Sequence, residues 1–481
     1  MSAVQRQSRF ERSDDVVVMK FGGTSVEDAA AIRRLFGIVR SRLGSRPVLV
    51  VSALARVTDQ LLEAGNAAAA GHLGSALAIV RNIYVRHEQL ADSLVDESAY
   101  SVLDGELRGE FRELESLLHG LEASCELTLK SQDHLLGFGE RFSSRLVKEA
   151  LCQVGIKAAH VDAQACIVTD ARHAGAGPVW DVTEQRLQEN VIPLLESGHV
   201  PVLGGFIAST SDGVPTTLGR GGSDFSAAIV AAALCASRLE IWTDVDGIMT
   251  ADPKICADAH LIRKMSFDEA EELAHFGAKV LHPATLAPAM RENIPVHVLN
   301  SRRPEGEGTE ILARAKTGNL VSAITAKRKV AVVEIESAGG VDSEFLRAVS
   351  AVFDRHSCAV DLMALSLGRM SLLVDSAASL PAIASDLRGV AEVRWENHKA
   401  LVCLVGESIR RHPDVASRVF AAVSDMDVRV ICQGASDRTI SFLVEESNVE
   451  ESVQRLHGVF FPQPEPARDW GGINSAFCQA G

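Results

Sequence analysis

The stretch KFGGTS (residues 20–25) combines residue types that suit the binding of a phosphate group. It places Lys20 directly after the apolar run VVVM, and Gly22 and Gly23 follow. Glycines let a backbone turn sharply and approach a ligand closely, and a lysine adds a mobile positive charge. The stretch is not a Walker motif, which requires Gly-Lys-Ser/Thr after a glycine-rich loop. Taken alone, it fits a phosphate-binding loop and an ordinary strand-to-helix turn equally well.

A second stretch, LGRGGSDFSA (218–227), is suited to a carboxylate. Arg220 stands between glycines just before a predicted helix, and its planar guanidinium can bind a carboxylate through two hydrogen bonds. The start of the helix adds positive potential, and Asp224 falls in its first turn. The alternative is a helix cap beside a solvated arginine. The concentration of glycines around one arginine favours the ligand-binding interpretation.

Two further stretches place hydroxyls or a carboxylate close to predicted strands and helices. SALARVTD (52–59) offers Ser52 and Thr58, although hydroxyls after a strand often only cap a helix. GFGERFSSRL (137–146) is predicted to begin a helix with Glu140. The carboxylate of Glu140 either answers the helix dipole or holds a ligand ammonium group.

Two lysines complete the set of charged candidates. TDVDGIMTADPKI (243–255) contains Lys254, in a hairpin, a surface loop or a ligand-binding loop. FGAKVLHP carries Lys279 in a predicted helix that Pro283 should end or bend. The set offers lysines, an arginine and glycines but no obvious general base. Phosphoryl transfer fits this set, because it depends on positioning and charge neutralisation.

The elements that must position these residues alternate between apolar strands and amphipathic helices up to about residue 300. The strands are predicted at VVVMK, PVLVVSA, AAHVD, VPVLGGF and LEIWTDV, and several helices fill about 58–152. Ser25 with Asp28 is expected to form a capping box at the first helix. Continuous apolar strands separated by helices predict a mostly parallel sheet covered on both faces. Such sheets bind ligands at the carboxyl ends of their strands, where the candidate stretches fall.

A repeat with an offset of 70 residues dominates the C-terminal part of the chain. KVAVVEIES pairs with KALVCLVGES, which aligns Lys329 with Lys399, and SLLVD pairs with SFLVEE, which aligns Ser371 with Ser441. Each copy reads as strand, helix, strand, strand, helix and a final element. The pattern predicts a tandem βαββαβ arrangement, a small ferredoxin-like module used twice.

Composition excludes several classes of protein. The 481 residues carry a net charge of −15 spread along the chain, which argues against a nucleic-acid partner. The nine cysteines include no C-x-x-C pair and are typical of reduced thiols, so we expect a cytoplasmic location. Residues 1–15 lack the apolar segment of a signal peptide, and the apolar helix predicted at 226–236 is too short to span a bilayer. We therefore expect no membrane partner.

In its motifs the chain resembles the aspartokinases of the amino-acid kinase family. The matching stretches are KFGGTSV, VVSA, GER, TLGRGGSD, WTDVDGI and FGAKVLHP, and the repeat resembles the ACT pair of those enzymes. The resemblance implies an α/β fold, with a three-layer kinase domain at 16–305 followed by ACT modules at 326–395 and 396–465. Flexible tails are expected at 1–15 and 466–481.

The resemblance also implies an activity. Aspartokinases transfer the γ-phosphoryl group of ATP, bound as its magnesium complex, to the β-carboxylate of L-aspartate. The product, 4-phospho-L-aspartate, opens the route to lysine, threonine and methionine. Two other functions stay open, namely another amino-acid kinase of the family and a decayed kinase whose ACT modules sense an amino acid. No homoserine dehydrogenase domain is expected after the repeats.

Site residues carry over from the family by position. The catalytic residues implied are Lys20 and Asp224, and no resident metal ligand is implied. The implied aspartate-binding residues are Ser52, Thr58, Glu140, Arg220 and Ser223. The implied nucleotide-binding residues are Lys20, Gly22, Gly23, Thr243, Asp244, Met249, Lys254, Lys279 and Val280. Family members often carry an aromatic residue at the position of Met249 and an arginine at that of Lys254, so contacts to the nucleotide are expected to be weaker here.

The ACT pair implies an amino-acid effector and a homodimer or higher homo-oligomer. Ala359, Leu367 and Gly340 stand where lysine-sensitive relatives place polar or specific contacts, and Asp361 and Asp342 are the carboxylates nearby. We therefore expect weak inhibition by lysine alone. A smaller effector fits better, with threonine the first candidate.

Overall fold

The chain divides into two compact units. The computed structural model describes residues 16–277, 283–315, 320–337 and 339–462. The first unit comprises Met1–Ile248 and Leu261–Thr317, and the second comprises Met249–His260 and Gly318–Gly481. The segment 249–260 therefore packs with the C-terminal unit, although it lies within the predicted kinase domain. The domain boundaries given above remain predictions.

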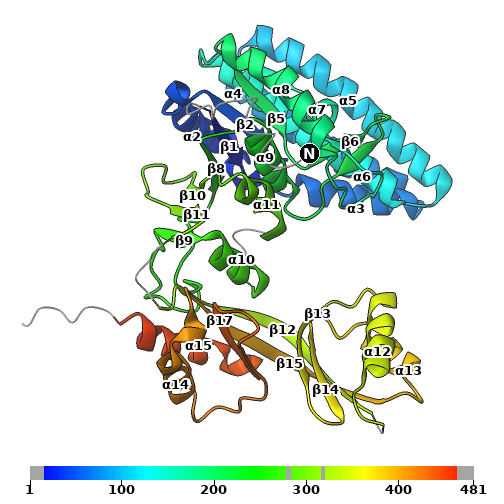
Figure 1. The fold of residues 1–481 in the computed structure, drawn as a ribbon. Helices are drawn as coiled ribbons and strands as arrows, with labels where there is room; N and C mark the ends of the chain where they lie inside the picture. Colours follow the sequence, from blue (N-terminus) through cyan, green and yellow to red (C-terminus); the bar gives the residue numbers. More distant parts are fainter. Residues whose placement is uncertain (1–15, 278–282, 316–319, 338, 463–481) are drawn as a thin grey trace, which may run out of the picture. The chain divides into compact units, whose positions relative to one another are not determined.

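An eight-stranded sheet forms the centre of the first unit (Figure 1). In spatial order its strands are β3 (Ala158–Val161), β5 (Val200–Gly204), β2 (Pro47–Val51), β1 (Val17–Phe21), β8 (Arg238–Thr243), β10 (Val296–Asn300), β11 (Thr309–Leu312) and β9 (Lys264–Ser266). All neighbours run parallel except β10 and β11, which are antiparallel. The central strands are buried along their length, as expected for a sheet covered on both faces.

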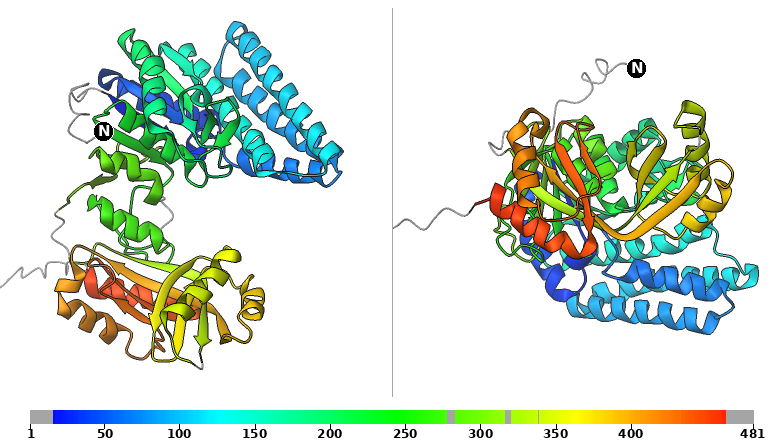
Figure 2. Two further views of the ribbon diagram at one scale, coloured as in Figure 1. Left: turned by 45° about the vertical axis from the view of Figure 1, so that its right-hand side comes forward. Right: turned by 90° about the horizontal axis from the view of Figure 1, so that it is seen from below.

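Helices cover both faces of this sheet. One face carries α2 (Ala29–Arg40) and α6 (Leu129–Gln153), with α3 (Val57–Ala69), α4 (Leu73–Leu94) and α5 (Glu97–Ser124) packed outside α6. The other carries α8 (Trp180–Glu196), α9 (Gly222–Ala233) and α11 (Pro283–Arg291). Figure 2 shows the long helices α4 and α5 side by side at the edge of the unit. The three-layer α/β fold is thus confirmed, with α9 buried as predicted.

Smaller elements complete the first unit. They are the helices α7 (Ala163–Cys166) and α10 (Phe267–His275), the 3-10 helices η1 (Gly23–Ser25) and η2 (Leu43–Ser45), and a sheet of β4 (Val168–Thr169), β6 (Ile207–Thr210) and β7 (Pro215–Thr217).

Two local predictions are wrong. Glu140 does not begin a helix, because α6 already starts at Leu129 with Thr128 as its cap. The glycines at 137 and 139 mark close packing inside the helix rather than its boundary. At the first helix, the carboxylate of Asp28 accepts the Ala31 N–H at 2.7 Å and caps α2, whereas Ser25 lies in η1 and takes no part.

The second unit is built on a six-stranded antiparallel sheet. In spatial order its strands are β13 (Val360–Leu365), β14 (Arg369–Val374), β12 (Ala323–Glu336), β15 (Glu392–Val405), β17 (Thr439–Glu445) and β16 (Ile431–Gln433). The helices are α12 (Ser343–Arg355), α13 (Leu380–Asp386), α14 (Pro413–Ala422) and α15 (Val449–Phe460), with the 3-10 helices η3 (Ile409–Arg411) and η4 (Glu446–Asn448). The order of elements repeats as the sequence predicts.

The two modules share their longest strands. The first part of β12 pairs with the last part of β15 (Ala323 with Val405), and the last part of β12 pairs with the first part of β15 (Val333 with Trp395). The break between the two parts is marked in each strand by a residue in the left-handed region, Lys329 at φ 61° and His398 at φ 60°. Each module therefore contains part of a strand that continues into the other.

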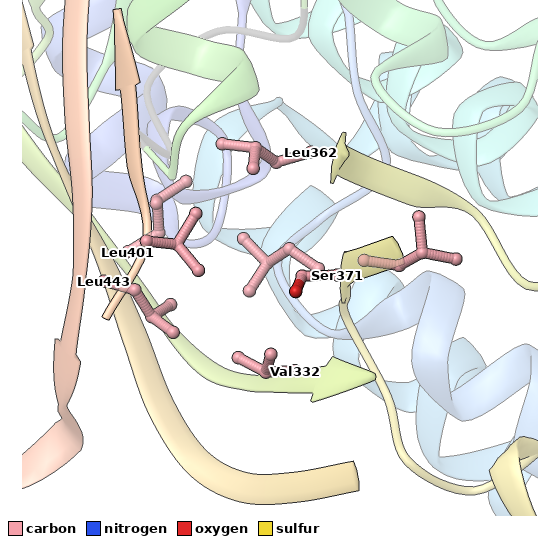
Figure 3. Close-up of a pocket in the computed structure, with 8 residues that line it drawn as sticks. Val332, Leu362, Ser371, Leu401 and Leu443 are labelled. Carbon is pink, nitrogen blue, oxygen red and sulfur yellow. The ribbon is translucent and has the colours of Figure 1, made fainter. Parts of the chain in front are cut away.

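Side chains from both modules also meet on the sheet face away from the helices. Val332, Leu362, Leu401 and Leu443 surround a small apolar hollow there (Figure 3). Their neighbours along β12 and β15, such as Val333 and Val402, point to the opposite face and join the helix-covered cores. The modules are thus joined by packing as well as by strand pairing.

Among the helices of the described residues, none combines the length and the apolar character needed to cross a membrane. The same residues contain no group of three or more His, Cys, Asp or Glu side chains that could hold a metal ion. The cytoplasmic location remains a prediction.

Candidate active site

The predicted phosphate and carboxylate loops lie at one edge of the eight-stranded sheet. β5, β2, β1 and β8 are neighbours, and backbone hydrogen bonds continue past their carboxyl ends. The Gly205 N–H donates to Val51 O at 2.8 Å, the Ser52 N–H to Phe21 O at 3.0 Å, and the Gly22 N–H to Trp242 O at 3.1 Å. Each loop is therefore held by the strand beside it.

Glycines allow the elements around this edge to approach closely. A Cβ added to Gly23 would lie 2.9 Å from Ala53 O, and one added to Gly139 would lie 2.7 Å from the Ala53 Cβ. A Cβ on Gly205 would lie 2.7 Å from the Ser223 Cβ. Real Cβ atoms do not come this close to other heavy atoms, so a side chain at any of these glycines would force the elements apart.

Lys20 and Asp224 form an ion pair at the centre of the edge. The Lys20 Nζ lies 2.7 Å from the Asp224 Oδ1, and both side chains are mostly buried. Lys20 comes from β1 and Asp224 from the first turn of α9, so the pair joins the phosphate loop to the glycine–arginine loop. A Cβ on Gly22 would lie 3.7 Å from the Lys20 Nζ, so the glycine leaves space beside the ammonium group.

Glu140 projects from the middle of α6 and is only 3% exposed. Its Oε2 has no hydrogen-bond partner in the structure. Burial raises the pKa of Glu140 to about 8, although a hydrogen bond from the Ala53 N–H and the positive charge of Lys20 act in the opposite direction. A carboxylate in this position is ready for a ligand cation, which would restore the stabilisation that water no longer provides.

The loop around Arg220 adopts a conformation that requires glycine. Gly219 and Gly221 have φ values of 76° and 71°, and Gly221 caps α9. Arg220 itself is exposed and forms no ion pair with the residues that the structure describes. Ser223 stands half-buried in the first turn of α9. The guanidinium is thus carried on a loop whose conformation the glycines permit, and it is available to bind an anion.

The hydroxyls of Ser52 and Thr58 lie on the neighbouring loop and helix. Ser52 directly follows β2, Thr58 is in the first turn of α3, and both are half-buried. Ser52 adjoins Ala53, whose N–H reaches Glu140. Ser52 is therefore held close to that carboxylate by the chain itself.

Asp133, which supports the loop of Arg220, was not predicted from the sequence. This buried carboxylate accepts hydrogen bonds from the Thr217 Oγ1 at 2.5 Å and the Ala174 N–H at 3.1 Å, and pairs with the His173 Nδ1 at 2.7 Å. The Ala174 O in turn lies 3.0 Å from the position of a Cβ on Gly219. A lone acidic residue in an amphipathic helix carries no local signal of such a role.

Arg86 of α4 was also missed. Its guanidinium donates to Ala55 O at 2.7 Å and to Glu27 O at 2.9 Å, and so joins the loops that follow β1 and β2.

A second unpredicted connection joins the phosphate loop to β8. The Ser25 Oγ donates to the Ser301 Oγ at 2.8 Å, and Ser301 donates through its N–H and its hydroxyl to Thr243 O.

The residues predicted on the nucleotide side are only partly gathered here. Thr243 ends β8, and its Oγ1 lies 3.4 Å from the Oδ1 of the exposed Asp244. Met249 and Lys254 belong to the second unit. Lys279 and Val280 lie outside the described residues. The nucleotide-binding assignments therefore remain predictions.

Comparison with known proteins places the site in a family context. Residues 15–300 match the amino acid kinase family, and residues 402–460 match an ACT domain. The chain is 34% identical over 458 residues to the lysine-sensitive aspartokinase 3 of Escherichia coli, covering 93% of this chain and 99% of the relative. It is also 34% identical to the chloroplastic aspartokinase 3 of Arabidopsis thaliana, covering 92% of this chain and 81% of that protein.

Solved structures of similar proteins agree with the sequence matches. E. coli aspartokinase III in complex with aspartate and ADP, in the R-state, aligns with a TM-score of 0.81, covering 93% of this chain and 100% of that chain at 34% identity. The same enzyme in complex with lysine and aspartate, in the T-state, aligns with a TM-score of 0.79 at the same coverage and identity.

The raised pKa of Glu140 predicts a specific effect on stability. Because the folded protein binds this proton more tightly than the unfolded chain, the stability that the protonated carboxyl provides is complete below about pH 4.5 and is lost as the pH rises toward 8. Glu140→Gln should therefore leave the melting temperature of the ligand-free protein nearly unchanged at pH 5 and raise it at pH 8.5.

Glu113→Gln is the matched control for that experiment. Glu113 is exposed, and although desolvation alone would raise its pKa, the hydrogen bond and the charge of Arg141 lower this pKa overall. Its removal should give no stabilisation at high pH. A Glu140→Gln protein that melts below the wild type at pH 8.5 would contradict the assignment of an uncompensated carboxylate.

Proposed function

This chain belongs to the amino acid kinase family and is an aspartokinase, and we propose a role for each site residue in the reaction. In that reaction the γ-phosphoryl group of ATP is transferred to the β-carboxylate of L-aspartate. The observation that carries the proposal is the buried carboxylate of Glu140 with one unpartnered oxygen. The α-ammonium group of an amino acid would complete it. This requirement favours aspartate over N-acylated substrates, which lack the positive charge.

Glu140 and Arg220 select a free α-amino acid. Glu140 binds the α-ammonium group, and Arg220 binds the α-carboxylate through its planar fork. Adjacent glycines support this arrangement, since Gly204 packs on Glu140 while Gly205 packs on Ser223. Ser52, Thr58 and Ser223 line the same pocket with hydroxyls.

Lys20 and Asp224 act on the phosphoryl group. The Lys20 ammonium neutralises the charge that develops on the transferring group, and Asp224 holds this ammonium in place from 2.7 Å. Gly22 and Gly23 allow the phosphates to approach the backbone. ATP would arrive as its magnesium complex, and the metal would supply positive charge at the phosphates. The protein residues therefore contribute position and charge rather than a general base.

The nucleotide side comprises Thr243 and Asp244 after β8, together with Met249, Lys254, Lys279 and Val280. We assign these residues to the ribose, base and phosphates of ATP as a group, on the basis of their positions in the family motifs.

We further propose that the second unit assembles the protein into a homodimer or larger homo-oligomer. Its two edge strands, β13 and β16, expose apolar side chains, with Leu365 at 54% and Ile431 at 52% exposure. Unpaired strand edges are covered by association in many proteins. Sedimentation at micromolar concentration should show at least a dimer, and a compact monomer would contradict this.

A hydroxamate-trapping assay tests the reaction. With magnesium and ATP, hydroxylamine should trap the acyl phosphate 4-phospho-L-aspartate when L-aspartate is supplied. Faster turnover of glutamate or N-acetylglutamate would identify another amino-acid kinase. Absence of product with every amino acid would indicate a catalytically decayed sensor.

Two variants separate the catalytic and binding roles in this assay. Lys20→Ala should lower kcat at least ~10²-fold, because loss of one preorganised charge at the transition state typically costs about 3 to 4 kcal/mol. Arg220→Ala should act mainly on the KM for aspartate, because the α-carboxylate keeps its charge throughout the reaction. A collapse of kcat with unchanged KM in Arg220→Ala would show that the roles are wrong.

The carboxylates near the predicted effector site are already engaged within the second unit. The Asp361 Oδ2 pairs with the Lys327 Nζ at 2.7 Å, and Lys327 also pairs with Asp375. Asp342 caps α12 by accepting the Phe345 N–H at 2.8 Å. Leu367, which stands where a specific contact was expected, is 96% exposed. These contacts support the expectation that the ε-ammonium of lysine finds no free partner here.

We therefore predict weak inhibition by lysine alone, although one relative is named for its sensitivity to lysine. Inhibition curves with lysine, threonine and methionine, singly and in pairs, provide the measurement. Half-inhibition by lysine below about 1 mM, roughly 4 kcal/mol of binding, would contradict the prediction. Lys327→Met frees Asp361 and should increase the sensitivity to lysine.

A further inference from the structure

One short segment belongs to the second unit, although the chain on both sides of it belongs to the first. The chain leaves the first unit after Ile248, contributes Met249–His260 to the second unit, and re-enters the first at Leu261. We call residues 249–260 the excursion. It begins a few residues after Thr243 and Asp244, and it carries Met249 and Lys254. Four of the residues proposed for the nucleotide side thus lie on or just before it.

Apolar packing embeds the excursion in the second module. Ala251 and Cys256 are 3% and 5% exposed and belong to the core formed by α14, α15, β15 and β17. At the edge of that core, the Ile324 N–H at the start of β12 donates to Thr250 O at 2.8 Å. The excursion is therefore anchored in the core of the module through these residues, while others, including Lys254, are exposed.

Two polar side chains of α15 hold the excursion. The Gln454 Nε2 donates to Ile255 O at 2.8 Å. The His457 Nε2 lies 2.9 Å from the Thr250 Oγ1, and His457 is only 2% exposed. The ring of His457 also meets the rings of His260 and Phe461 at centroid distances of 5.9 and 4.8 Å. One helix thus contacts both ends and the middle of the excursion.

Thr250 connects α15 to both ends of the excursion, because it contacts His457 of α15 and His260. Its Oγ1 accepts the His260 N–H at 3.0 Å, and its own N–H donates to His260 O at 2.9 Å. The hydroxyl therefore joins the first residues of the excursion, its last residue and His457. Loss of His457 would leave this buried hydroxyl without one of its partners, and would remove the ring against which His260 packs.

From these contacts we propose that His457 and Gln454 are positioning residues for the nucleotide side of the reaction, and that they act by holding the excursion, which carries Met249 and Lys254. The residues assigned to aspartate come from the loop after β2, from α3 and α6, and from the loop before α9 and its first turn, and do not include this segment. A displacement of α15 should therefore change the interaction with nucleotide and leave aspartate binding unaffected. The inference rests on the proposed function for its assignment of the nucleotide side.

His457→Ala, Thr250→Val and the milder surface variant Gln454→Leu test the proposal in the full chain. Loss of one buried hydrogen bond should raise the KM for ATP about five-fold, roughly 1 kcal/mol, with less than a two-fold change in the KM for aspartate. His457→Gln keeps a donor and should recover part of the effect. Amide hydrogen exchange in the peptide covering 249–260 should be faster in His457→Ala.

Ser452→Ala is the matched control. Ser452 is buried on the same helix, but its hydroxyl bonds to Asn448 O and Met426 rather than to the excursion. Both KM values and the exchange of 249–260 should stay at wild-type levels in this variant. Thermal unfolding of every variant shows whether a change in KM reflects loss of the fold.

Calorimetric binding of magnesium–ADP separates failure of this inference from failure of the proposed function. A wild-type chain that binds ADP but phosphorylates no amino acid would contradict the proposed function, while weaker ADP binding in His457→Ala would still support the inference. Equal increases in both KM values, or unchanged ADP affinity despite faster exchange in 249–260, would overturn it.

Discussion

Close backbone approach at the carboxyl edge of the sheet is the constraint on which the site depends. Gly139 brings α6 against Ala53, and the consecutive Gly204 and Gly205 bring β5 against Glu140 and Ser223. Protein interiors are close-packed, so these contacts fix the separations of α6, β5 and α9. Residues from distant parts of the sequence are thus placed around one small volume before any ligand is present.

The charged residues proposed for the phosphate and those proposed for the amino acid differ in whether they already have a partner of opposite charge. On the phosphate side, Lys20 is already paired with Asp224, so its ammonium is held without a substrate. On the amino-acid side, Glu140 lacks a partner for one oxygen and destabilises the empty protein when it ionises. Such stored instability is common at functional sites, where stability and activity compete. In the proposed assignment, the amino acid therefore supplies a positive charge that an ionised Glu140 lacks, whereas the nucleotide meets a lysine whose charge is already balanced by Asp224.

The sequence revealed the parts of this arrangement that are local. Glycines and a lysine after an apolar run, or an arginine among glycines before a helix, are recognisable because the chain needs them within a few residues. Glu140 was recognised, but its place in α6 was not, because glycines used for close packing resemble a helix boundary. Asp133 and Arg86 act through contacts with distant loops, and a single charged residue in an amphipathic helix gives no sign of its partner. The packing of residues 249–260 with the second unit was not predicted for the same reason, since their contacts are with α15, which is distant in the sequence.

The separation between Thr250 and His457 has a consequence for biosynthesis. The two residues are 207 positions apart, and α15 is the last helix that the structure describes. At the usual rates of translation, roughly 10 to 40 seconds pass between their emergence from the ribosome. During that interval Ala251 and Cys256 lack the helix that covers them, and they are available to chaperones or to neighbouring nascent chains. The residues proposed to bind the amino acid can thus all be present on a ribosome-bound chain before α15, which holds the excursion, has been synthesised.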